Sequence, residues 1–134
     1  MISDVRLIFL GPVYIDNHIE ELHANAFAYL HGHEVGGTNP SLLKAMGCSN
    51  LILANGTEYN KEVLGNNGLF FNNNIDDIKR IIEFAESDKI DVPALKEGAR
   101  KRMIKYYNWD YSAELHLKYF NYVLGNNNKY EETF

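Results

Sequence analysis

Short, continuous apolar runs that alternate with helical patterns constrain the fold of this chain more than any other feature. The runs are four or five residues long, which suits a strand buried on both faces better than a helix. Strands of this kind, separated by helices, are typical of a parallel sheet covered on each side. The predicted strands are residues 6–10 (RLIFL), 27–30 (FAYL), 51–54 (LILA) and 68–71 (GLFF).

Helical periodicity fills the segments between these runs and the whole chain after the fourth one. The first predicted helix begins at Asn17, where Glu20 has the spacing of a capping-box partner. Proline, which is favoured in a first helical turn, stands at the start of two of the others. The remaining predicted helices begin near Pro40, Asp76, Pro93 and Asp110. The fold class we predict is therefore α/β, with about four parallel strands, flanking helices and a helical C-terminus.

Composition limits the classes of function. The 134 residues suffice for one domain, and a net charge of −5 argues against nucleic acid as a partner. No apolar run approaches the roughly 20 residues of a membrane span. The single cysteine, Cys48, has no internal partner for a disulfide, which fits a reducing compartment. We expect a cytoplasmic protein without a transmembrane segment.

A glycine-bearing loop follows the second predicted strand and opens directly onto the helix at Pro40. Gly36, Gly37, Thr38 and Asn39 would present backbone N–H groups, with the threonine hydroxyl, to an anion at this helix N-terminus. The alternative is an ordinary glycine turn in which Asn39 or Thr38 caps the helix. The sequence leaves both interpretations open.

His31 and His33 lie at the carboxyl end of the second predicted strand, where α/β sheets usually place ligands. At a period of two they share one face of the strand. A metal site would need a third ligand, and nothing nearby supplies one except Glu34. We therefore expect the histidines to line a ligand pocket or to form structural hydrogen bonds, and we expect no metal.

Several blocks of the sequence resemble the C-terminal half of retaining glycosyltransferases with the GT-B fold. The resemblance is strongest to the branch that includes bacterial rhamnosyltransferases and other enzymes of sugar-polymer assembly. It covers roughly residues 5–124, and the central block is the specific part. The blocks are VRLIFLGPVY, ANAFAYLHGHEVGGTNPSLLKAMGCSNLILA, EYNKEVLGNNGLFF and the tail GARKRMIKYYNWDYSAELHLKYF.

The resemblance implies an incomplete Rossmann-like domain over residues 1–124, followed by a frayed tail at 125–134. In such enzymes this half binds a nucleotide diphosphate sugar, whose hexosyl group is transferred to a growing surface glycan. The nucleotide sugar is a substrate, so no cofactor and no metal are implied. The full enzyme would be cytoplasmic or peripheral to the inner face of the membrane.

The resemblance also assigns positions around the loop. The family has two glutamates in this region, of which the first contacts the donor sugar and the second contacts the ribose of the nucleotide. In this chain their positions are occupied by Gly36 and Lys44. An ammonium group cannot accept the ribose hydrogen bonds that a carboxylate accepts. Lys44 would then reach a phosphate or carboxylate of another donor, or face solvent in a chain that has lost activity. Asn60 and Glu62 fall on a short helix beside the nucleotide, or on a capped surface helix.

The chain lacks the parts that would complete such an enzyme. The resemblance implies that the acceptor domain and the first two strands of the donor domain lie outside this sequence, together with the arginine and lysine that neutralise the diphosphate in the family. We therefore expect the chain to be inactive alone. The strand at residues 6–10 would pair with residues 27–30 through a right-handed crossover, or an exposed sheet edge would recruit a second copy or the missing N-terminal half. The alternative function is a degenerate, non-catalytic interaction module.

Overall fold

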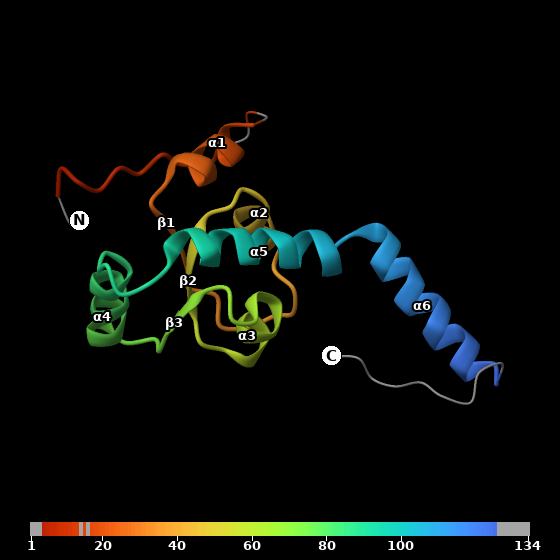
Figure 1. Cartoon of the computed structure of the whole chain (residues 1–134). Coiled ribbons are helices and arrows are strands. Elements are labelled where there is room, and N and C mark those ends of the chain that lie inside the picture. The colour runs from red at the N-terminus through yellow and green to blue at the C-terminus, as the bar shows by residue number, and fades with distance from the viewer. Residues whose placement is uncertain (1–3, 14, 16, 126–134) are drawn as a thin grey trace.

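The computed structural model describes residues 4–13, 15 and 17–125. Three parallel strands form one sheet in the order β1-β2-β3 (Figure 1). In the register of the sheet, Leu30 lies opposite Leu53, and Leu53 lies opposite Leu69. The α/β class and the parallel sheet predicted from the sequence are confirmed. The strands are β1 (Ala28–His31), β2 (Leu51–Asn55) and β3 (Leu69–Phe71).

The central strand β2 is buried along its whole length, and its side chains alternate between two apolar clusters. Ile52 and Ala54 pack in the cluster formed with three helices on one face of the sheet. Because neighbouring strands run parallel, right-handed crossovers carry two of these helices to that same face. The helices are α2 (Pro40–Gly47), α3 (Glu58–Leu64) and α5 (Val92–Tyr106).

The opposite face of the sheet is covered mainly by α4 (Ile75–Ala85). Leu51 and Leu53 of β2 pack there with Ile81 and Ala85 of this helix. Helix α4 contacts β3 and leaves β1, at the other edge of the sheet, less covered. Leu30 of β1 accordingly remains 49% exposed.

Two helices contribute no buried residue: α1 (His18–Asn25) and α6 (Trp109–Val123). Helix α1 packs beside α2, whereas α6 follows α5 and extends away from the sheet (Figure 1). The other helix positions agree with the sequence patterns to within a few residues, including the short helix α3. Gly125 lies in a turn after α6, and the rest of the predicted frayed tail lies outside the described residues.

Polar side chains fix the start of five helices by accepting a hydrogen bond from a backbone N–H in the first turn. This explains why α2 begins at Pro40, since the proline ring suits the first helical position and Asn39 supplies the cap. The capping residues are Asn39, Thr57, Asn74, Asp91 and Asn108.

The prediction of a strand at residues 6–10 is wrong. This segment follows a turn at residues 5–6, has no regular structure and joins no ladder, so the sheet of the described residues has three strands and none of them pairs with it. The predicted capping box is also wrong. Asn17 adopts φ 69° with no side-chain cap, and the carboxylate of Glu20 pairs with Lys44 instead. The apolar pattern of residues 6–10 thus has no partner strand among the described residues. The carboxylate of Glu20, which the capping pattern assigned to the helix start, pairs with a residue far along the chain.

Candidate functional site

The carboxyl ends of the three parallel strands meet at one edge of the sheet, which brings the loops that follow them together. The side-chain amide of Asn60 donates to the carbonyl oxygens of His33 (3.1 Å) and Asn55 (2.9 Å). The backbone N–H of Gly56 donates to the carbonyl of Phe71 (2.8 Å). These bonds connect the loops after β1, β2 and β3. Open α/β sheets bind ligands at such an edge.

The loop at residues 32–39 leads from β1 to α2 and is exposed except at Asn39. Gly36 has φ 116°, a conformation that favours glycine, and open space surrounds the position of a Cβ atom. Across the described part of the chain, the backbone N–H groups of Gly36, Gly37 and Thr38 donate no hydrogen bond. Three polar donors thus stand free in front of a helix N-terminus.

Asn39 differs from the other loop residues, because its side chain is already used. Its Oδ1 atom accepts from the backbone N–H of Ser41 (2.9 Å), and its carbonyl oxygen accepts from the N–H of Leu43 (3.1 Å). Pro40 has no N–H to offer. Asn39 is therefore the N-cap, as the structural interpretation of the loop proposed, and residues 36–38 are the ones left for a ligand.

His31 is fully buried at the end of β1, although it is polar. Its Nδ1 atom lies 3.2 Å from the hydroxyl of Tyr29, which also has Ser41 of the first turn of α2 as a partner. The Nε2 atom has no hydrogen-bond partner. An unsatisfied buried nitrogen costs free energy, so its presence calls for an explanation.

The rings of His31 and His33 are stacked, with centroids 4.7 Å apart and planes 18° apart, as expected for two side chains on one face. Burial lowers the pKa of His31, and the neighbouring charge of His33 lowers it further. His31 is therefore neutral at pH 7 and presents one N–H and one lone pair. His33 is exposed above it.

Lys44 lies on α2 with its ammonium group directed to α1. Its Nζ atom is 2.8 Å from Oε1 of Glu20, and both side chains are about half exposed. The hydrogen bond to Glu20 raises the pKa of Lys44 and lowers the pKa of Glu20. This ion pair accounts for Lys44 without any ligand.

The two other nucleotide-side candidates lie on α3 in different environments. Asn60 is buried, and its amide is used in the two loop bonds described above. Glu62 is exposed, and its carbonyl oxygen accepts from Nη2 of Arg102 (2.7 Å). Asn60 thus holds the loops in place, while Glu62 presents its carboxylate to solvent near the end of α3.

Two groups of contacts were not anticipated, one at this edge and one at the C-termini of α2 and α3. The amide of Asn73, after β3, donates to the carboxylate of Glu34 in the loop after β1. Arg102 donates from Nε to the carbonyl of Val63 (2.9 Å) and thereby caps the C-terminus of α3. Arg100 donates likewise to Gly47 at the end of α2. Both arginines of α5 thus donate to carbonyl groups of other helices.

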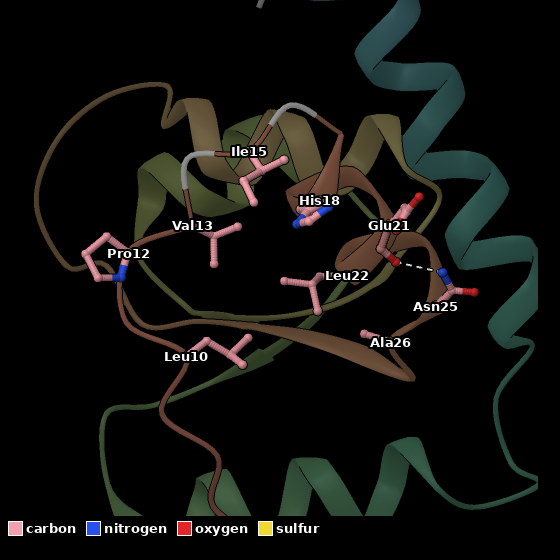
Figure 2. Close-up of a pocket in the computed structure, with 9 residues that line it drawn as sticks. All are labelled: Leu10, Pro12, Val13, Ile15, His18, Glu21, Leu22, Asn25 and Ala26. Atoms are coloured by element: carbon pink, nitrogen blue, oxygen red, sulfur yellow. Dashed lines mark hydrogen bonds between the residues drawn. The ribbon is translucent and has the colours of Figure 1, made fainter.

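A groove lies away from this edge. It encloses about 690 Å³ between the N-terminal segment and α1, and Figure 2 shows side chains from both entering the same space. Its position gives it no contact with the loop at residues 32–39. The lining residues are Leu10, Pro12, Val13, Ile15, His18, Glu21, Leu22, Asn25 and Ala26.

Within residues 4–13, 15 and 17–125, no three His, Cys, Asp or Glu side chains converge as a metal site would require. No helix in that same part of the chain has the length and hydropathy to cross a membrane. A scan against protein-family models found no matching family, and searches of curated proteins and of solved structures found no match. The candidate site therefore rests on its own geometry.

Proposed function

We propose that the carboxyl edge of the sheet binds the diphosphate of a nucleotide sugar. The observation that carries the proposal is the set of three free backbone N–H groups at Gly36, Gly37 and Thr38, directly before α2. Backbone N–H groups and the positive end of a helix dipole stabilise phosphate oxygens. The chain would supply the donor-binding part of a glycosyltransferase that transfers a hexosyl group to a surface glycan.

His31 and His33 would contact the sugar in this proposal. The Nδ1 atom of His31 faces Tyr29, so Nε2 is the atom left for a sugar hydroxyl. A neutral imidazole nitrogen can donate to a hydroxyl or accept from one, according to its tautomer. A movement of the exposed loop at residues 32–39 would open the path to this atom.

In this proposal the chain alone binds weakly and transfers nothing. Lys44, the cation of α2, is already paired with Glu20. A diphosphate leaving group needs charge stabilisation that backbone N–H groups supply only in part. The proposal assigns the missing cations and the acceptor site to a separate N-terminal partner.

Calorimetric titration tests the proposal. UDP, GDP and dTDP, each with and without an attached hexose, should include at least one ligand with a Kd on the order of 1 mM. The corresponding nucleosides, which lack phosphate, should not bind. Heats equal to dilution for every nucleotide at about 5 mM would overturn the donor-site assignment.

A matched pair of variants locates the site. Gly36→Val forces a side chain into a backbone conformation with φ 116° and should abolish binding, because the loop must rearrange. Gly32→Val introduces the same side chain into open space in the same loop, where φ is not positive, and should leave the affinity within about twofold.

A further inference from the structure

The strand β1 presents an unpaired backbone edge. Among the described residues it pairs with β2 on one side and with nothing on the other. The N–H and C=O groups along such an edge accept an additional strand. Leu30, half exposed on this strand, adds an apolar side chain to the edge.

The same chain contains an apolar segment without a partner. Residues 6–10 have no regular structure after a turn at residues 5–6, and they project from the domain (Figure 1). Ile8 is 78% exposed and Phe9 is 85% exposed. Within the described residues, the backbone hydrogen bonds of the segment are those that the N–H groups of Arg6 and Leu7 donate to Asp4. A contiguous exposed apolar segment of this kind marks an interaction site.

The position of α1 shows that this segment fits the free edge of β1. The amide of Asn50 donates to the carbonyl of His23 (2.8 Å), and Lys44 pairs with Glu20, so α1 is held on the face of the sheet that α2 covers. A strand that precedes α1 and is joined to β1 by a right-handed crossover over this face lies beside β1. Residues 11–27 give the crossover the dozen or more residues that it needs.

The segment does not close onto its own domain. A groove of about 690 Å³ separates it from α1, with Leu10 and Val13 on one side and Leu22 on the other (Figure 2). Gly11, with φ 68°, and Pro12 form the bend from which the segment departs. This open arrangement is the one that each protomer of a strand-exchanged dimer adopts.

We propose that the occupant of the β1 edge is the 6–10 segment of a second copy of this chain. The sheet has two free edges, at β1 and at β3, and the crossover through α1 leads to the β1 edge. Among the described residues, the 6–10 segment thus lacks a ladder and the β1 edge lacks a strand. Reciprocal exchange between two copies satisfies both in each copy and leaves neither exposed, which is the closed symmetry of a twofold dimer. This inference does not rest on the donor-site proposal.

Sedimentation velocity at about 5 to 200 µM protein tests the exchange. The unmodified chain should become dimeric within this range. The double variant Ile8→Lys/Leu10→Lys, in which both residues are exposed, should keep its far-UV circular dichroism and remain monomeric throughout. Ile75→Lys, an equally drastic change at an 85% exposed site on α4, should dimerise like the unmodified chain. A monomer at every concentration, or a dimer that survives the double variant, would overturn the proposal.

Cross-linking distinguishes a second copy from the chain's own segment. Phe9→Cys and Leu30→Cys are made on separate chains, each with Cys48→Ser, and mixed under mild oxidation. A disulfide that joins the two different variants is the expected result. When both cysteines are placed in one chain, a disulfide that forms only within monomers would show pairing in the same chain and overturn the proposal.

Discussion

Lys44 of α2 and Glu20 of α1 form an ion pair across two helices, with Nζ and Oε1 2.8 Å apart. The resemblance places a ribose-binding carboxylate at position 44, and the structure brings a carboxylate to this position from another helix. The pair also holds α1 against the face of the sheet that α2 covers. One contact therefore bears on the proposed nucleotide site and on the geometry of the β1 edge.

Exchanging the two charges tests the meaning of position 44. In Glu20→Lys/Lys44→Glu the ion pair is preserved, so the thermal unfolding midpoint should stay within about 3 °C. If position 44 faces the ribose, the new carboxylate accepts its hydroxyl groups and the Kd for a nucleoside diphosphate should fall about tenfold. Calorimetric titration measures the Kd for the nucleoside diphosphate in the exchanged variant and in the unmodified chain.

The matched control for the charge exchange is Glu114→Lys/Lys118→Glu on α6, which reverses another exposed ion pair (2.7 Å) far from the loop. It should change neither stability nor affinity. An unchanged Kd in the exchange at positions 20 and 44 would show that Lys44 lies outside the ribose site.

The buried His31 predicts a loss of stability in mild acid. Burial lowers its pKa in the folded chain, whereas the unfolded chain takes up a proton at the ordinary value near 6.5. As the pH falls below about 6.5, the unfolded state binds the proton first and the free energy of unfolding decreases, until the lowered pKa is reached. Above that window both states are neutral and the contribution is constant.

Urea denaturation at pH 7.5, 6.5 and 5.5 measures this effect, and His31→Gln should reduce the decrease. His23, whose pKa is lowered chiefly by burial, leaves part of it. His18→Gln, an exposed histidine on α1, serves as the control and should keep the full pH dependence. The same slope in His31→Gln as in the unmodified chain would contradict the role given to the buried ring.

Asn60 predicts a coupling between two loops. Asn60→Ala removes the amide that donates to the carbonyl oxygens of His33 and Asn55, and should lower the free energy of unfolding by about 1–3 kcal/mol. It should also weaken diphosphate binding, because the loop at residues 32–39 loses its anchor. Chemical denaturation and calorimetry report the two effects separately.

Asn66→Ala provides the comparison for Asn60, since this side chain is exposed and lies on the same segment of the chain. Its effect should stay within about 0.5 kcal/mol. If Asn60→Ala lowers the free energy of unfolding no more than Asn66→Ala does, the two loop bonds contribute nothing to stability in solution.

Arg102 predicts a geometric requirement at the end of α3. Its guanidinium group donates to the carbonyl oxygens of Val63 and Glu62 at 2.9 and 2.7 Å. Arg102→Lys keeps the charge but loses the fork, and should lower the free energy of unfolding by about 1–2 kcal/mol. Lys101→Arg, at an exposed neighbour on α5, should have no such effect. Equal stability of the two variants in urea would contradict the capping role of Arg102.

The strands β1, β2 and β3 were predictable because their apolar runs satisfy a local condition. Burial on both faces of a parallel sheet demands continuous hydrophobicity, and LILA, which gives most of β2, has it. Residues 6–10 have the same local character, yet form no strand, because a strand requires a backbone partner and none of the described strands pairs with this segment. A sequence pattern shows what a segment can form and does not show its partner.

The candidate site was predictable in position and only partly in detail. The glycines at residues 36 and 37 indicated an open loop before a helix, and the period of His31 and His33 indicated a shared face. The ion pair of Lys44 joins residues 24 positions apart, and the bond from Asn60 to His33 joins residues 27 positions apart. The unsatisfied Nε2 of His31 reflects burial by the fold around it. Such contacts follow from the packing of the helices on the sheet and leave no local signal.

The central claim is tested most directly by two-dimensional amide NMR of the labelled chain during titration with UDP, GDP and dTDP and their hexose conjugates. The account predicts that the largest shift changes occur at the backbone N–H groups of Gly36, Gly37 and Thr38, and that they disappear in Gly36→Val. Absence of shift changes with every nucleotide, or changes centred away from the loop at residues 32–39, would contradict it.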